Sequence, residues 1–248
     1  MLFLRSLVFN LLAYASFGVL AILFLPTLPF GRRAIFVAAR TWSRTTLWLL
    51  RHVVGLKLEI RGREHLPPGG CLVASKHQSA LETFGVVPTI GDFAFILKRE
   101  LNWVPLFGWY TSRSGMIGID RRGGSTTLRR LIVPARRAVA EGRRIIIYPE
   151  GTRRPIDARR DYKFGANYLY SALGVPCVPV AVNTGLFWPR RSFLRLPGTA
   201  VVEFLEPIPP GLDRRTFAAV LQDRIEAATV RLVEEARMGA RRPAAVTA

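Results

Sequence analysis

The distribution of apolar and polar positions divides the chain into two parts. The first is a long apolar segment, and in the second, short β-branched runs alternate with stretches of helical periodicity. Residues 6–31 contain no charged side chain, and about 20 consecutive apolar residues suffice to cross the hydrocarbon core of a bilayer. Residues 34–55 then mix arginines and tryptophans with apolar residues at helical spacing, which is typical of a helix at a membrane interface. Pro26 and Pro29 separate the two segments. The pattern predicts a membrane-associated helical hairpin over residues 1–55.

The sequence leaves open how this hairpin meets the bilayer. A single complete span and a hairpin confined to one leaflet both fit its apolar length. A cleaved signal peptide fits less well, because the apolar run continues beyond the "AYA" at residues 13–15. The run is followed by Arg32, Arg33, Arg40 and Arg44. By the positive-inside rule, these arginines place the rest of the chain on the cytoplasmic side of the inner membrane.

Residues 56–238 alternate short β-branched runs with helical stretches. Strands are predicted at residues 56–60, 71–75, 93–97, 115–119, 145–148, 177–182 and 200–205, and helices at residues 80–88, 125–141, 164–173 and 213–238. Strands interleaved with helices indicate a single α/β domain with a mostly parallel or mixed central sheet flanked by helices. Residues 239–248 lack either pattern and are predicted to form a flexible tail.

The charge and the apolar content of the chain indicate which class of partner it binds. The chain of 248 residues has 36 basic and 17 acidic side chains, a formal net charge of +19, which indicates anionic partners. Because 50% of the residues are apolar and no recognised nucleic-acid-binding motif is present, a membrane is favoured over nucleic acid. Cys71 and Cys177 are far apart, form no CxxC pair and are predicted to be core thiols rather than metal ligands.

The segment "SKHQSALETF" at residues 75–84 places His77 five positions before Glu82. Five residues of continuous α-helix turn the chain by about 500°, so these side chains meet only if His77 lies in the loop before the helix. A buried strand, a polar loop and a helix follow one another here, which is the usual location of sites in open α/β sheets. Two interpretations remain open: Glu82 orients His77 as a general base, or it caps the helix together with Ser79.

Three further motifs follow strands or begin them. "YPEGTRR" at residues 148–154 would present backbone amides and Arg153 at the edge of the sheet, and a fixed arginine suits a phosphate. A plain strand-ending turn explains the same residues. "GMIGIDRR" at residues 115–122 ends another strand in charged residues, and "VPCVPV" at residues 175–180 begins a third. Each motif is weak on its own.

Together and in this order, the motifs resemble those of the glycerolipid acyltransferases, the family of the 1-acylglycerol-3-phosphate acyltransferases. His77 through Glu82 is similar to the family's His-x-x-x-x-Asp, and residues 148–154 are similar to its Phe-Pro-Glu-Gly-Thr-Arg-Ser. Residues 118–121, 175–180, 97–109 and 162–166 also look like family segments, so the resemblance covers residues 71–180. It favours the dyad interpretation, because a helix cap does not explain the other motifs.

The chain departs from the family pattern at three positions. Glu82 stands where the pattern has aspartate, Gly118 where it has phenylalanine, and Arg154 where it has serine. The additional methylene of Glu82 implies either a helix that is set back slightly or an imidazole that is held differently. The other two departures alter the expected shape of the acceptor site.

The resemblance implies transfer of an acyl chain from acyl-CoA or acyl-acyl carrier protein to the free hydroxyl of 1-acylglycerol 3-phosphate, making phosphatidic acid for phospholipid biosynthesis. His77 would remove the hydroxyl proton and Glu82 would orient the imidazole. Backbone amides at the start of the following helix are candidate oxyanion donors. No metal or bound cofactor is implied, since the thioester is a co-substrate. The residues implied to bind the acceptor are Lys98, Arg121, Glu150, Gly151, Thr152 and Arg153.

Two other functions remain open at this stage. The first is the same reaction with another lysophospholipid or a lyso-ornithine lipid as the acceptor, because Arg153 favours a phosphate but does not prove one. Alternatively, the chain is a membrane-anchored protein without catalysis that binds anionic lipid through its basic surface.

Overall fold

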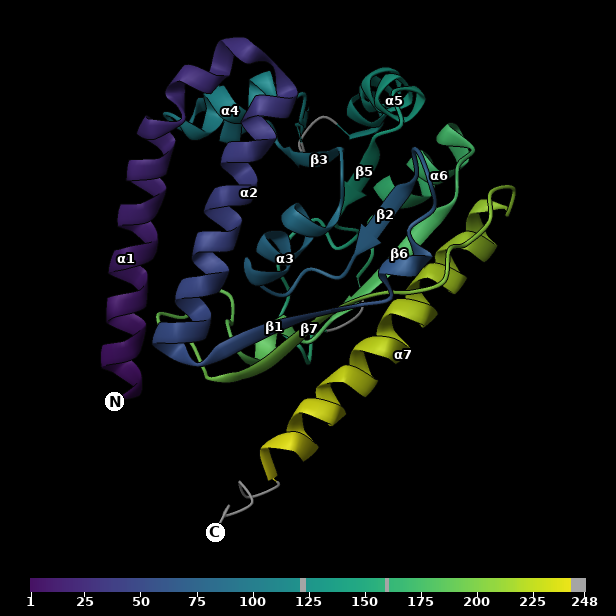
Figure 1. The fold of residues 1–248 in the computed structure, drawn as a ribbon. Helices are drawn as coiled ribbons and strands as arrows, with labels where there is room; N and C mark the ends of the chain where they lie inside the picture. The colour runs from purple at the N-terminus through teal and green to yellow at the C-terminus, as the bar shows by residue number, and fades with distance from the viewer. Residues whose placement is uncertain (121–123, 159–160, 242–248) are drawn as a thin grey trace.

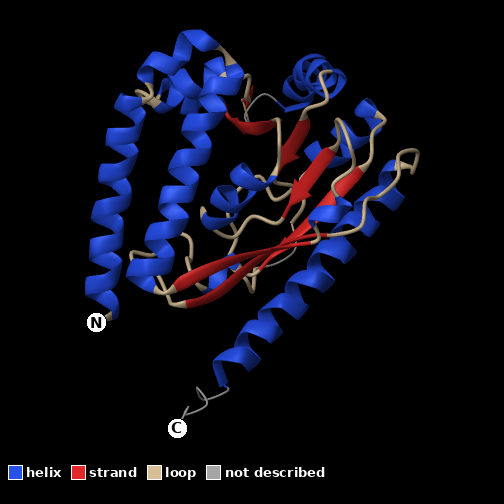
Figure 2. Cartoon of the chain, in the orientation of Figure 1, coloured by secondary structure: helices blue, strands red, loops and turns tan. Residues whose placement is uncertain are grey.

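The computed structural model describes residues 1–120, 124–158 and 161–241, and a mixed seven-stranded sheet forms its centre (Figures 1 and 2). The strand order is β1-β7-β6-β2-β5-β3-β4. All neighbouring strands pair in parallel except β6 and β7, which are antiparallel. The predicted α/β fold is confirmed. The strands are β1 (Leu56–Arg61), β2 (Leu72–Ser75), β3 (Phe93–Lys98), β4 (Ile117–Ile119), β5 (Arg144–Ile147), β6 (Cys177–Val182) and β7 (Gly198–Phe204).

Helices cover both faces of the sheet because successive strand residues alternate between the two faces. Leu72 and Ala74 of β2 pack against one layer of helices, while Cys71 and Val73 pack against the other. The first layer consists of α5 (Gly124–Ala140), α6 (Gly165–Leu173) and α7 (Arg214–Arg241). The second contains α3 (Leu81–Thr89) and α2 (Arg32–Leu49). Both cysteines are free and buried, as predicted, and burial raises the pKa of the Cys71 thiol to about 11.

The N-terminal residues form the expected helical hairpin. Helix α1 (Leu2–Leu23) is followed by a 3₁₀ segment (Leu25–Phe30) that contains both prolines, and α2 returns alongside α1. Among the described residues, α1 is the one helix that is long and apolar enough to cross a membrane, with a mean hydropathy of 2.0 over its best window. Polar contacts nevertheless attach α1 to the domain: Asn10 accepts from the Arg195 guanidinium at 3.1 Å and donates to the Phe193 carbonyl at 3.2 Å.

Two segments differ from the sequence-based expectation. The sequence pattern does not predict helix α4 (Phe107–Arg113) or the preceding 3₁₀ turn (Arg99–Trp103), because Pro105 and Gly108 interrupt the apolar periodicity. Helix α7 continues to Arg241, beyond the predicted end at residue 238, so the first residues of the expected tail are helical. Residues 242–248 lie outside the described part of the chain.

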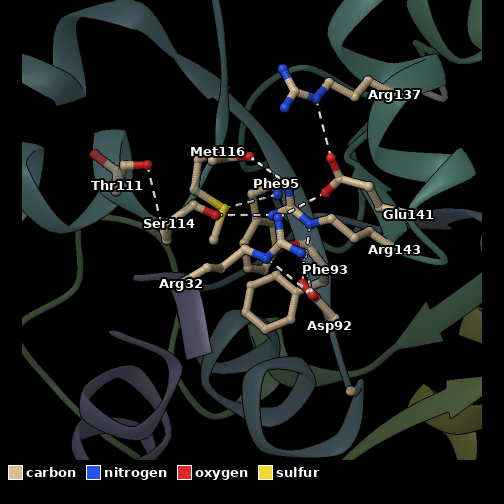
Figure 3. A network of polar contacts seen from close by, with 12 residues as sticks. Arg32, Asp92, Phe93, Phe95, Thr111, Ser114, Met116, Arg137, Glu141 and Arg143 are labelled. Carbon is tan, nitrogen blue, oxygen red and sulfur yellow. Dashed lines mark hydrogen bonds and ion pairs between the residues drawn. The ribbon is translucent and has the colours of Figure 1, made fainter. Parts of the chain in front are cut away.

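A buried arginine connects strand β3 with the turn after α4 (Figure 3). Arg143 is 4% exposed, and its guanidinium donates to the carbonyl oxygens of Phe93 at 2.5 Å, Ser114 at 3.0 Å and Gly115 at 3.1 Å. Phe93 and Ser114 are buried, so the arginine satisfies carbonyl groups that would otherwise be costly to bury.

The same arginine belongs to an ion-pair network that reaches the N-terminal hairpin. Asp92 pairs with Arg143 at 3.1 Å and with Arg32, the first residue of α2, at 3.0 Å. Arg32 also pairs with Glu141 at 2.9 Å. We refer to these four residues as the arginine clasp. The clasp fixes the start of α2 to the sheet domain.

We expect Arg143→Met to lower the free energy of unfolding by roughly 2–4 kcal/mol, because the substitution leaves the buried carbonyls of Phe93 and Ser114 without their side-chain donor and removes one of the two arginines that pair with Asp92. The matched control is Arg137→Met, whose side chain is 84% exposed and pairs with Glu141 one helical turn away. It should cost less than about 0.5 kcal/mol. Urea unfolding in detergent measures both. If both variants lost the same free energy of unfolding, the buried arginine would contribute no more to stability than the exposed one.

Candidate active site

The ends of three neighbouring parallel strands bring the predicted motifs to one edge of the sheet. Strand β2 lies between β5 and β6, with Ala74 opposite Ile147 and Ser75 opposite Val180. The residues that follow these strands include His77, Tyr148 and Thr184. Since all three strands run in the same direction, their carboxyl ends deliver these side chains to a single site.

His77 and Glu82 meet directly. The Nδ1 atom of His77 lies 2.8 Å from Oε1 of Glu82, with His77 in the loop after β2 and Glu82 in the first turn of α3. Glu82 is fully buried. With Nδ1 bound to the carboxylate, Nε2 is the ring nitrogen that remains to exchange a proton with a substrate.

Glu82 performs both of the roles that the sequence presented as alternatives. Its carboxylate accepts hydrogen bonds from the backbone N–H groups of Gln78 at 3.0 Å and Ser79 at 2.9 Å. It also accepts from the hydroxyl of Thr184 at 2.7 Å. The longer glutamate side chain therefore caps the helix start and orients the imidazole with one carboxylate. Thr184 was missed by the sequence analysis; the available signal was a polar Asn-Thr pair immediately after the buried strand β6.

The same contacts correct the expected source of oxyanion donors. The backbone amides of Gln78 and Ser79, at the start of the helix after His77, donate to Glu82 and point at its carboxylate rather than at a substrate. The amide of Arg154 is likewise occupied, because it donates to the His77 carbonyl at 2.8 Å.

An aromatic ring fixes the plane of the imidazole. Tyr148, which follows β5, stacks on His77 with a centroid distance of 3.8 Å and an interplanar angle of 17°. The Tyr148 hydroxyl forms a hydrogen bond of 2.8 Å with the Thr83 hydroxyl, and burial raises the pKa of Tyr148 well above its ordinary value. The ring thus serves as a neutral wall against His77.

Glu150 lies behind the site rather than in contact with an acceptor, which corrects its expected role. It is 1% exposed, and its carboxylate accepts from the His77 backbone N–H at 2.7 Å and pairs with Lys76 at 3.1 Å. Lys76 is also buried and pairs with Glu226 of α7 at 2.5 Å. Burial raises the pKa of the Glu150 carboxyl, and Lys76 and the His77 amide partly offset that rise. This buried cluster holds the backbone of His77 in place.

The His77 side chain opens into a cavity of about 840 Å³. Its interior is apolar and lies between the N-terminal hairpin, β3 and α4, with Phe36, Trp42 and Phe95 among its walls. Part of its wall is formed by Ser114, whose carbonyl the arginine clasp binds. The cavity therefore joins a reactive histidine to a space suited to a hydrocarbon chain.

The polar part of the cavity wall contains most of the other predicted residues. Gly151, Thr152, Arg153 and Lys98 all line it, and Gly151 adopts a φ of +66°, which favours glycine. Arg121 lies outside the described residues. Two further lining residues, Arg190 and Arg191, belong to no motif that the sequence singles out. The Arg190 guanidinium donates to the Arg153 carbonyl at 3.0 Å.

The two remaining departures from the family pattern have local explanations. A side chain at Gly118 would approach Asn102 and Arg99, because a Cβ there would lie 3.3 Å from the Asn102 amide nitrogen. Arg154 does not line the cavity; its guanidinium pairs with Asp161 at 2.8 Å.

Comparison with known proteins gives consistent results. Residues 57–183 match the sequence model of the protein family described as Acyltransferase. The chain is 37% identical over 201 residues to the 1-acyl-sn-glycerol-3-phosphate acyltransferase of Pseudomonas aeruginosa, covering 80% of this chain and 78% of the relative. It is 30% identical over 169 residues to the human 1-acyl-sn-glycerol-3-phosphate acyltransferase alpha, covering 67% of this chain and 60% of that relative.

The fold is similar to the crystal structure of the 1-acyl-sn-glycerophosphate acyltransferase from Thermotoga maritima. The TM-score is 0.74 at 24% sequence identity, and the superposition covers 98% of this chain and all of that chain. This likeness extends to the arrangement of elements across the whole length.

We expect Lys76→Met to lower the free energy of unfolding by about 3–5 kcal/mol, because Glu150 and Glu226 would lose the buried cation that they share. Lys57→Met provides the control, since Lys57 is exposed on β1; its effect should stay below about 0.5 kcal/mol. Thermal and urea unfolding in detergent compare the two. A Lys76 variant as stable as the control would contradict the structural role assigned to this cluster.

Proposed function

The chain belongs to the 1-acylglycerol-3-phosphate acyltransferase family, and from this premise we propose that it acylates the free hydroxyl of 1-acylglycerol 3-phosphate, making phosphatidic acid. The observation that carries the proposal is the His77–Glu82 pair, which opens into an apolar cavity with arginines on its polar wall. The acyl donor in the proposal is a thioester, either acyl-CoA or acyl-acyl carrier protein, and the reaction uses no bound cofactor.

In the proposed mechanism, Nε2 of His77 accepts the proton of the acceptor hydroxyl as its oxygen attacks the thioester carbonyl carbon. The Glu82 carboxylate stabilises the resulting imidazolium through Nδ1. Collapse of the tetrahedral intermediate breaks the carbon–sulfur bond, and the imidazolium returns its proton to the departing thiolate. One ester bond forms and one thioester bond breaks, so the histidine ends the cycle as it began.

The polar wall of the cavity supplies positively charged side chains that can bind a phosphate group. Arg153 is exposed to the cavity, and Arg190 and Arg191 lie on the same wall. Guanidinium groups bind phosphate oxygens in a bidentate manner. In the proposal Arg153 binds the acceptor phosphate, with Lys98 as a second cation, while Gly151 and Thr152 shape the turn that presents Arg153.

The N-terminal hairpin supports membrane association, and we place the catalytic domain on the cytoplasmic side of the inner membrane. The support is the apolar α1 helix followed by Arg32 and Arg33, since positive side chains flanking an apolar segment stay in the cytoplasm. A lysolipid acceptor resides in that bilayer. The net charge of +19 suits anionic lipid and the acidic or phosphorylated carriers of the acyl group.

We expect His77→Ala to reduce acyl transfer to 1-acylglycerol 3-phosphate by about 10²–10⁴-fold, the usual contribution of a general base. The fold should survive, because the helix-capping bonds of Glu82 to Gln78 and Ser79 do not involve the imidazole. Purified protein, a labelled acyl thioester and a panel of lysolipids, including lysophospholipids and lyso-ornithine lipid, provide the assay. Transfer that persists in the variant would favour a protein without catalysis at this site, and transfer only to another lysolipid would change the acceptor.

Glu82→Gln separates the charge of Glu82 from its shape. All four partners of the carboxylate donate hydrogen bonds, so an amide NH₂ group must face at least one donor. We expect a loss of roughly 1–3 kcal/mol in the free energy of unfolding together with a fall in kcat. Urea unfolding and steady-state kinetics measure the two effects. A variant as stable as the wild type would contradict the conclusion that the Glu82 carboxylate accepts hydrogen bonds from four donors.

Arg153→Gln should raise KM for 1-acylglycerol 3-phosphate by about tenfold while leaving kcat nearly unchanged, because a charged hydrogen bond to phosphate contributes about 1.5 kcal/mol. Arg154→Gln is the matched control, since its side chain pairs with Asp161 and does not line the cavity. Equal KM values in the two variants would assign the phosphate to another cation.

A further inference from the structure

Two segments that are far apart in sequence form an exposed aromatic surface at one end of the molecule. The turn between α1 and α2 packs against α4 at the upper end of Figure 1. The Tyr110 hydroxyl on α4 joins them by donating to the Ala21 carbonyl at 2.7 Å. We call this surface the aromatic apex. Its exposed members are Ile22, Leu23, Phe30, Leu101, Trp103, Val104 and Trp109.

The exposure of the apex is unusual for a surface in contact with water. Phe30 is 78% exposed, Trp103 is 71% exposed and Trp109 is 54% exposed. Monomeric soluble proteins rarely expose such residues in one contiguous patch. Tryptophan prefers the boundary between hydrocarbon and headgroups, where its ring is buried and its N–H group remains hydrated.

The charges around the apex match an anionic lipid surface. Residues 1–35 contain no acidic residue, and Glu100 is the single acid in residues 98–113. Glu100 is already paired with Lys98 at 3.3 Å. Arg33 and Arg113 are exposed beside the apolar residues, so the rim presents positive charge where headgroup phosphates would lie.

The apex continues the apolar surface of α1 into a different part of the chain. Ile22 and Leu23 end the exposed apolar face of α1, and Trp103 and Trp109 extend it onto residues 99–113. We propose that residues 99–113 form a second membrane-contacting element, which inserts Trp103 and Trp109 into the interface of the same anionic bilayer that α1 enters.

This contact places the bilayer against the outer side of the cavity wall. Leu101, Phe107 and Tyr110, from the same segment, line the cavity on its inner side. Trp103 and Trp109 do not line the cavity. The segment therefore separates the apolar cavity from the hydrocarbon of the membrane by one layer of side chains, and its outer residues can be altered without reshaping the cavity.

The test attaches an environment-sensitive fluorophore to a cysteine in place of Trp103, and in a second variant to a cysteine in place of Trp109. The native Cys71 and Cys177 are fully buried, so labelling is confined to the new thiol. The full chain is reconstituted into vesicles of phosphatidylethanolamine and phosphatidylglycerol whose acyl chains carry a nitroxide quencher. Asp223→Cys, at an exposed position on α7 across the sheet, is the matched control.

We expect the labels at positions 103 and 109 to shift their emission to shorter wavelength and to be quenched by the lipid nitroxide, while the label at position 223 is quenched by aqueous iodide. Each labelled protein must retain the melting temperature of the unlabelled chain. Emission and lipid quenching at 103 and 109 equal to those at 223 would overturn the proposal and assign the apex to a protein partner or to water. Since no substrate is present, the outcome is independent of acyltransferase activity.

Discussion

The site depends on one buried carboxylate that must satisfy four hydrogen-bond donors. Glu82 is fully buried, and a buried charge without partners would be costly. Its donors come from the loop between β2 and α3 and from the segment after β6. Three of these donors are local, and the fourth, Thr184, reaches the carboxylate because β6 pairs with β2. The complete set of four donors therefore depends on the observed register of these two strands.

The parts of the site that were predictable from the sequence are those formed by neighbours along the chain. His77 and Glu82 are five residues apart, and a strand, a loop and a helix N-terminus bring them together by local geometry. The sequence presented the helix cap and the dyad as alternatives because it does not show how many acceptor positions a carboxylate uses. In the structure, one glutamate serves both.

The parts that were missed depend on strand order. Thr184 is 102 residues from Glu82, and Glu226 is 150 residues from Lys76. Local patterns identified the strands but carried no information that β2 lies between β5 and β6. Glu150 was expected to face a substrate because it belongs to a recognisable turn, whereas its burial follows from Lys76, which sits behind the same turn. Helix α4 was missed for a different reason, since Pro105 before it and Gly108 within it interrupt the apolar periodicity.

The N-terminal hairpin is part of the reaction chamber as well as an attachment to the membrane. Phe36, Ala39 and Trp42 of α2 form cavity wall, Phe36 packs on Phe93 of β3 at 4.7 Å, and the arginine clasp ties Arg32 to the sheet domain. Such a hairpin is not a modular anchor that another apolar helix of equal length could replace. The apolar helix α1 and the cavity wall of α2 belong to one hairpin, so a change in the way the hairpin packs would also alter the shape of the cavity.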